Sequence, residues 1–176
     1  MKNLKPAYRG IIEGFYGPMW SHEERLHLIR HLREWNMNLY IYSPRDDPYH
    51  RFCWDRPYPP DEMQNFRELA KEARKQGAQF AYAISPGNTF DPDRPEHRMA
   101  LVNKLQPFIK PGCTFFPIFY DDLENGFDPD TDAGVRHAEL QARVMNGLAE
   151  SITRLCPSAT LLFCPTQYMT ADKSRY

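Results

Sequence analysis

The sequence has no apolar run long enough to cross a membrane and no excess of charge of either sign. Its longest nearly apolar stretch, Cys113 to Tyr120, is far shorter than the roughly 18 residues of a membrane span, and residues 1–10 lack the apolar core of a signal peptide. Lysine and arginine number 22 against 23 aspartates and glutamates, which gives a net charge of −1. This balance provides no basic surface for nucleic acid or an anionic membrane. We therefore expect a cytoplasmic protein with no nucleic-acid or membrane partner.

Cysteine is also scarce, and the four cysteines show no CxxC spacing typical of zinc or redox motifs. Cys113, Cys156 and Cys164 lie in or beside apolar segments, which favours buried free thiols over disulfides. The chain contains neither a GxGxxG motif nor a P-loop. We expect no metal and no cofactor.

The 176 residues fit one domain, and 41% apolar and 26% charged residues are typical of a folded protein. The most unusual feature of the composition is its 16 prolines, nearly twice the average share.

Between these prolines, helix and strand patterns alternate. Ser21 and Glu24, for example, form a capping box at the start of a helix. Helices are predicted at about residues 21–35, 60–77, 95–109 and 133–155, and strands at residues 8–13, 39–42, 79–84, 114–120 and 160–164.

Strict alternation of strands and helices implies right-handed crossovers and a parallel sheet, so the fold class is α/β. Every predicted strand is followed by a polar or glycine-containing cluster. The clusters are residues 14–17, 43–47, 85–87, 121–122 and 165–168. An open doubly wound sheet is the alternative, but it favours a glycine-rich phosphate-binding turn. Clusters at all the carboxyl ends favour a (β/α)8 barrel of the TIM type, whose active site is built from those loops.

Asp121 and Asp122 directly follow the apolar fourth strand. Desolvation and mutual repulsion would raise the pKa of one carboxyl group, as a general acid requires near neutral pH. Spacing alone leaves two alternatives open: the aspartates cap a turn through backbone N–H groups, or they bind a metal together with Glu124.

The other strand-end residues are weaker candidates when each is taken alone. Gly14 and Gly17 flank Tyr16, and they either let the backbone approach a ligand closely or form a tight turn with positive φ. Arg45, with Asp46 and Asp47 beside it, either forms a salt-bridged loop or lines a sugar site. Tyr168 either caps a pocket or lies on the surface.

Histidines in the first helix resemble a zinc-protease motif, but the resemblance fails on register. After His22 and Glu23, that motif requires histidine at position 26, which is leucine. His27 and His31 fall on the polar face of the helix, and we expect them to be solvated.

Taken together, five segments at the predicted strand ends strongly resemble glycoside hydrolase family 84, which comprises β-N-acetylglucosaminidases, protein O-GlcNAcases and hyaluronidase-like enzymes. The resemblance runs from about Arg9 to Tyr168, with the motifs in family order. The segments are IIEGFYGPMW (11–20), YIYSPRDD (40–47), YAISPG (82–87), FYDD (119–122) and FCPTQY (163–168).

The resemblance implies a retaining hydrolysis in which the acetamido oxygen of the sugar attacks the anomeric carbon to form an oxazoline. Asp121 is then expected to hold the acetamido N–H, and Asp122 to protonate the leaving oxygen and later activate water. No protein nucleophile is required, unlike in the usual scheme with two carboxylates. The implied partner is a glycan or glycoprotein that contains N-acetylglucosamine.

The resemblance also implies substrate-binding roles for Gly14, whose carbonyl would contact a sugar hydroxyl, and for Tyr16, Arg45 and Tyr168. Arg45 stands where the family usually has a lysine, and its planar guanidinium places its donors differently.

Only five of eight barrel strands are predicted. Residues 1–176 are therefore expected to be the amino-terminal part of a single glycoside hydrolase catalytic barrel, truncated after the fifth strand. The alternative is a non-catalytic N-acetylhexosamine-binding module that needs a second segment or chain to complete the sheet.

Overall fold

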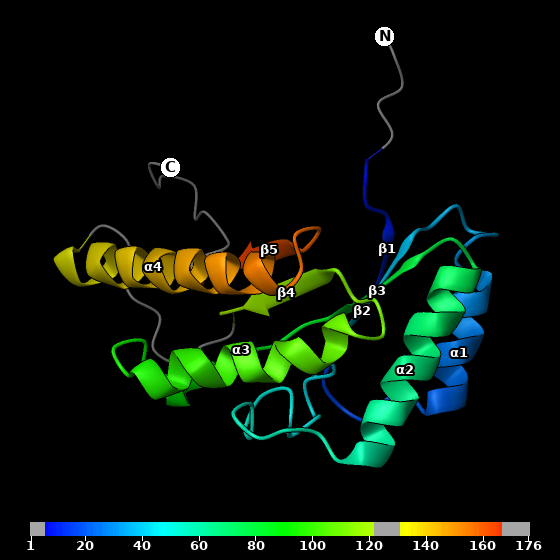
Figure 1. The fold of residues 1–176 in the computed structure, drawn as a ribbon, viewed down its shortest axis with the longest axis horizontal. Coiled ribbons are helices and arrows are strands. Elements are labelled where there is room, and N and C mark those ends of the chain that lie inside the picture. Colours follow the sequence, from blue (N-terminus) through cyan, green and yellow to red (C-terminus); the bar gives the residue numbers. More distant parts are fainter. Residues whose placement is uncertain (1–5, 122–130, 167–176) are drawn as a thin grey trace, which may run out of the picture.

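The computed structural model describes residues 6–121 and 131–166, in which strands and helices alternate along the chain (Figure 1). The strands are β1 (Gly10–Glu13), β2 (Leu39–Tyr42), β3 (Gln79–Tyr82), β4 (Phe115–Phe119) and β5 (Thr160–Cys164). The α-helices are α1 (His22–His31), α2 (Pro60–Lys75), α3 (Pro95–Ile109) and α4 (Asp132–Leu155), and a short 3-10 turn, η1 (Gly87–Thr89), precedes α3. The predicted α/β alternation is confirmed.

Helix α1 begins at the predicted capping box and ends before the predicted boundary. The Ser21 hydroxyl accepts a hydrogen bond from the Glu24 N–H at 3.3 Å, and the Glu24 carboxylate accepts one from the Ser21 N–H at 2.7 Å. Asn36 adopts a left-handed φ of 55°, and the Met37 N–H donates to the Leu32 carbonyl at 2.8 Å. This reversal ends the helical region and turns the chain toward β2.

The five strands form one parallel sheet in the order β1-β2-β3-β4-β5. In a doubly wound sheet the strand order reverses at a switch point, whereas consecutive strands are neighbours in a βα barrel. The sequential order therefore excludes the doubly wound alternative for the described strands and matches part of a barrel. All carboxyl ends of the strands lie at the same edge of the sheet.

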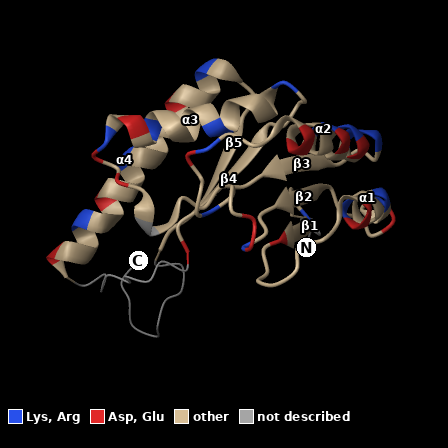
Figure 2. Cartoon of the chain, turned by 90° about the horizontal axis from the view of Figure 1, so that it is seen from below, with Lys and Arg blue, Asp and Glu red and all other residues tan. Residues whose placement is uncertain are grey.

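The two faces of the sheet have different environments. The larger core cluster joins strand side chains such as Tyr40, Tyr82 and Phe116 to the helices, which form an arc along this face (Figure 2). Side chains on the opposite face form a second cluster of strand and strand-end residues: Leu39, Ile41, Ala81, Ala83, Phe115 and Phe119. This face corresponds to the side-chain-filled interior of a βα barrel.

The outer strands leave apolar side chains of this second face open to solvent. Ile12 in β1 pairs in register with Ile41, and its side chain is 53% exposed. Leu162 in β5 pairs with Pro117 and is 41% exposed. The described sheet therefore presents apolar surface at both of its edges.

Pro117 lies inside β4 without the bulge that a proline in a strand suggests. The bridges Ala81–Phe115 and Ile84–Ile118 keep the same register between β3 and β4 on either side of it. The Pro117 carbonyl accepts a hydrogen bond from the Ile84 N–H at 3.0 Å. Because proline has no N–H to donate, the ladder is interrupted between these bridges while the register is retained.

None of the four cysteines forms a disulfide, as expected, but their burial differs: Cys113 and Cys156 are buried, whereas Cys53 and Cys164 are partly exposed. Among residues 6–121 and 131–166, no helix is both long enough and apolar enough to span a bilayer.

Candidate active site

The loops after β1, β2 and β4 carry the predicted site residues that the structure describes. Gly14 and Tyr16 follow β1, Arg45 follows β2, and Asp121 follows β4. Because these strands are parallel and belong to one sheet, the loops lie at a common edge. The predicted residues Asp122 and Tyr168 lie outside the described residues.

Arg45 and Asp121 form an ion pair at this edge of the sheet. Arg45 Nη2 donates to Asp121 Oδ2, and only 7% and 15% of the two side chains are exposed. The Arg45 backbone N–H also donates to the carbonyl of Phe15 in the β1–α1 loop, at 3.2 Å. Arg45 thus bridges the loops after β1 and β4, rather than pairing only within its own acidic segment.

The second carboxylate oxygen of Asp121 has no donor among the described residues. Asp121 Oδ1 is shielded from solvent and accepts no hydrogen bond from any residue that the structure describes. A buried acceptor without a partner is costly, and a ligand N–H or O–H would remove that cost. The arrangement is suited to bind a ligand through a hydrogen-bond donor.

The β1–α1 loop begins at Glu13, the one charged residue within the five described strands. Its fully buried carboxylate accepts two hydrogen bonds from Arg25 of α1, both at 2.8 Å, and one from the Tyr40 hydroxyl at 2.6 Å. It also accepts a bond from the Trp20 N–H at 3.3 Å. Glu13 therefore fixes both ends of the loop that contains Gly14 and Tyr16. The sequence signal for this role is a single charged residue at the end of an apolar strand.

The two glycines of this loop differ in their backbone conformation. Gly17 has a φ of 100°, which favours glycine, and its N–H donates to Asp46 Oδ2 at 3.2 Å. The tight-turn interpretation therefore applies at Gly17. Gly14 has no positive φ, but an added Cβ would lie 3.1 Å from the side chain of Ile12.

Tyr16 lies at the exposed rim of the site, with 61% of the residue accessible to solvent. Its hydroxyl accepts a hydrogen bond from Arg51 Nη1 at 3.0 Å, and the Arg51 guanidinium carbon lies 6.0 Å from the ring centre. This pair links the β1–α1 loop to the β2–α2 connection.

His50 is a fully buried histidine in the β2–α2 connection that the sequence analysis did not select. Its ring nitrogens lie 2.9 Å from the Ala83 carbonyl and 3.2 Å from the Ser43 hydroxyl. Burial lowers the pKa of His50 to about 4, so the ring is neutral near pH 7. The neutral ring therefore contacts both the loop after β2, at Ser43, and the loop after β3, at Ala83.

The loop after β5 is held by helix α4. Gln141 Nε2 donates to the Thr166 hydroxyl at 2.6 Å, and His137 Nε2 lies 3.3 Å from the same oxygen. These contacts position the chain two residues before Tyr168.

The rings of His27 and His31 in α1 pack against each other in a tilted arrangement. The ring centres of His27 and His31 are 4.3 Å apart, and His31 Nδ1 lies 2.8 Å from the His27 carbonyl oxygen. His27 is exposed as expected, whereas His31 is partly buried. Within the described part of the chain, no group of three or more His, Cys, Asp or Glu residues has metal-site geometry.

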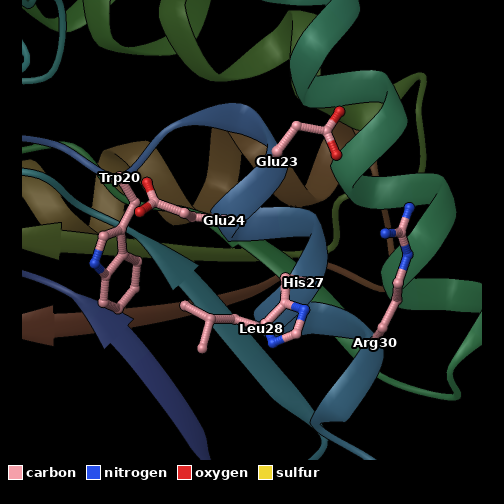
Figure 3. A pocket seen from close by; sticks show the side chains of 6 residues that line it. All are labelled: Trp20, Glu23, Glu24, His27, Leu28 and Arg30. Carbon is pink, nitrogen blue, oxygen red and sulfur yellow. The ribbon is translucent and has the colours of Figure 1, made fainter.

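A surface pocket of about 490 Å³ lies along α1 (Figure 3), and none of the four described site residues is among those that line it. Its lining residues are Trp20, Glu23, Glu24, His27, Leu28 and Arg30. The pocket is therefore distinct from the Arg45–Asp121 cluster.

Comparison with known proteins gives consistent matches over nearly the whole chain. A family model described as beta-N-acetylglucosaminidase matches residues 9–176. Protein O-GlcNAcases of Rattus norvegicus and Mus musculus are each 35% identical over 160 residues, which is 90% of this chain and 17% of each relative.

Two solved structures share the fold. A mutant O-GlcNAc hydrolase from Thermobaculum terrenum superposes with a TM-score of 0.82 at 35% identity, covering 91% of this chain and 35% of that chain. CpGH84B superposes with a TM-score of 0.80 at 36% identity, covering 92% and 28%. The described strands thus match part of a larger barrel. Because the family match extends over residues 9–176, the chain belongs to the β-N-acetylglucosaminidases of glycoside hydrolase family 84.

Proposed function

We propose that this chain supplies the catalytic aspartates of a retaining β-N-acetylglucosaminidase that removes terminal N-acetylglucosamine by substrate-assisted catalysis. The observation that carries the proposal is the geometry of Asp121: Oδ2 is held by Arg45, and the buried Oδ1 has no donor among the described residues. An acetamido N–H of the substrate is a donor of the kind that Oδ1 requires. Membership of the family supports the assignment of the reaction.

In the first step, Asp121 accepts the acetamido N–H and orients the carbonyl oxygen toward the anomeric carbon. That oxygen forms a bond to the carbon while the glycosidic bond breaks, and Asp122 transfers its proton to the leaving oxygen. The negative charge of Asp121 stabilises the positive charge that develops on the acetamido group. The product of this step is the oxazoline intermediate.

In the second step, Asp122 acts as a carboxylate base and removes a proton from water. The water oxygen attacks the anomeric carbon, and the bond to the acetamido oxygen breaks. Two successive inversions at the same carbon give net retention.

Arg45 holds Asp121 in the orientation that the reaction requires, and Gly14, Tyr16 and Tyr168 are the further residues to which we assign substrate binding. The planar guanidinium fixes the direction of its donors more strictly than a lysine ammonium does. The proposed substrates are glycans or glycoproteins with terminal N-acetylglucosamine, consistent with relatives described as Protein O-GlcNAcase.

A second candidate function is a non-catalytic N-acetylhexosamine-binding module that requires another segment or chain to complete its barrel. The exposed apolar residues Ile12 and Leu162 at the two edges of the sheet favour this alternative. The chain also spans only 17% of the length of the curated relatives.

One experiment separates the two functions. The purified chain is assayed on an aryl β-N-acetylglucosaminide, with the first anomer formed identified by NMR, and N-acetylglucosamine binding is measured by calorimetry. Hydrolysis with retention supports the enzyme. Binding without hydrolysis supports the module, and hydrolysis with inversion contradicts the mechanism. Absence of both activities contradicts the enzyme function of this chain, whereas the module is defined by its need for a further segment or chain.

A further inference from the structure

A buried carboxylate that the proposed reaction does not use lies two residues after Arg45. Asp47 is only 3% exposed and accepts hydrogen bonds from the Tyr42 hydroxyl at 2.7 Å and the Tyr58 hydroxyl at 2.6 Å. It also accepts a bond from the Tyr49 N–H at 2.8 Å. A carboxylate is buried at this level only where specific donors replace water.

The donors to Asp47 come from separate parts of the fold. Tyr42 ends strand β2, whereas Tyr49 and Tyr58 belong to the connection between β2 and α2. Burial raises the pKa of Tyr42 and Tyr58, so their hydroxyl groups remain protonated and donate. Asp47 therefore joins the end of the strand to the far end of the connection.

Lys104 of α3 extends this anchor to a third element. Its ammonium lies 4.2 Å from the ring centre of Tyr58 and 5.3 Å from that of Tyr49, and it donates to the Arg56 carbonyl. Burial lowers the pKa of Lys104 to about 8, and the charge of Asp47 opposes this change. The lysine thus packs over the two tyrosines that hold Asp47.

The backbone around Asp47 determines where Arg45 lies. The Asp47 N–H donates to the Pro44 carbonyl, and the His50 N–H donates to the Asp47 carbonyl, both at 3.2 Å. These bonds form a compact turn, and Arg45 extends from it to Asp121. If the Asp47 side chain is detached from the tyrosines, the turn loses its anchor.

We propose that Asp47 is a positioning residue that holds Arg45 against Asp121 and thereby orients the free oxygen of Asp121 toward the substrate. The effect on substrate binding rests on the proposed function, whereas the effect on Arg45 does not.

The Asp47→Asn variant tests the proposal because it keeps the shape of the side chain but removes its charge. Asp55→Asn is the matched control, since Asp55 is exposed in the same connection. We expect the Arg45 amide, bonded to Phe15, to exchange its hydrogen at least about tenfold faster in Asp47→Asn, while strand amides and the control remain unchanged. The Arg45 guanidinium NMR signal should shift in Asp47→Asn toward its position in Asp121→Ala. Unchanged exchange and an unchanged signal would overturn the proposal.

A double-mutant cycle measures whether Asp47 acts through Arg45. Asp47→Asn should weaken N-acetylglucosamine binding about tenfold in the wild-type background and have little effect in an Arg45→Ala background. Equal losses in both backgrounds would contradict the proposal, because a general structural defect is additive.

Two further outcomes remain decisive. If Asp47→Asn does not fold, Tyr58→Phe removes one donor while keeping the ring, and it should give the same changes at Arg45 to a smaller extent; no change there contradicts the proposal. If the wild-type chain binds no sugar, the proposed function fails, and the amide exchange and guanidinium signal of Arg45 still decide whether Asp47 positions it.

Discussion

Arg45 and Asp121 form a largely buried ion pair, although 76 positions separate them in the sequence. The contact connects the ends of β2 and β4, which are not neighbours in the sheet. Arg45 therefore reaches past the end of β3. This pair links the stability of the fold to the geometry of the candidate site.

Removing one partner of this pair should destabilise the protein. Arg45→Ala leaves the Asp121 carboxylate poorly solvated and without its charged donor, and we expect the free energy of unfolding to fall by about 2–3 kcal/mol, the cost of losing a hydrogen bond to a charged group. Urea denaturation measures the change. The control is Arg154→Ala, since Arg154 and Glu150 form a pair at 3.8 Å whose side chains are 79% and 71% exposed; it should cost less than about 1 kcal/mol. Equal effects of both variants would mean that burial of the Arg45 pair contributes nothing.

Asp121→Ala should reduce turnover of every β-N-acetylglucosaminide, whatever its leaving group, because Asp121 acts on the acetamido nucleophile. A loss of roughly 100-fold is expected for a preorganised group that stabilises developing charge. Steady-state rates over a series of aryl leaving groups provide the test. Comparable cleavage of the corresponding glucosides, which lack the acetamido group, would contradict substrate assistance.

Asp122→Ala should instead show a strong dependence on the leaving group. A leaving group of low pKa departs without a proton, so activated aryl glycosides should retain more activity than poor substrates. The slope of log rate against leaving-group pKa should become steeper than in the wild-type protein. An unchanged rate with poor leaving groups would remove Asp122 from the role of general acid.

His50 should make stability depend on pH below neutrality. Its pKa is about 4 in the folded protein and 6.5 as its ordinary value, so the unfolded chain binds a proton in this interval and the folded protein does not. Stability is therefore retained above pH 6.5 and decreases as the pH falls toward 4, by about 2 kcal/mol between pH 7 and pH 5. Urea denaturation of the wild-type protein and of His50→Gln at both pH values measures this contribution. The same pH dependence in both proteins would exclude His50 as its source.

Much of the fold could be predicted from local patterns. The Ser21–Glu24 capping box is present, and local patterns of apolar, β-branched and aromatic residues located each described strand and α-helix, because these patterns can be read within a few residues of sequence. The early end of α1 at His31 was missed: the Leu32 N–H donates to the Ile29 carbonyl instead of continuing the α-helical pattern, and left-handed Asn36 ends only the turns that follow. At Pro117 the lack of a backbone N–H follows from the residue type, but only the register of β3 and β4 excludes a bulge.

The sequence alone determined the alternation of elements, the family motifs and the candidate residues at the strand ends. Tertiary structure decided which of them meet: Arg45 with Asp121, Asp47 with Tyr58, and Glu13 with Arg25. It also decided that His50 is buried and neutral while His27 is exposed. The physical reason is the distance along the sequence between the residues that make contact. Periodicity and capping involve contacts within a few residues, whereas the partners of a buried charge are set by strand order and by loops distant in sequence.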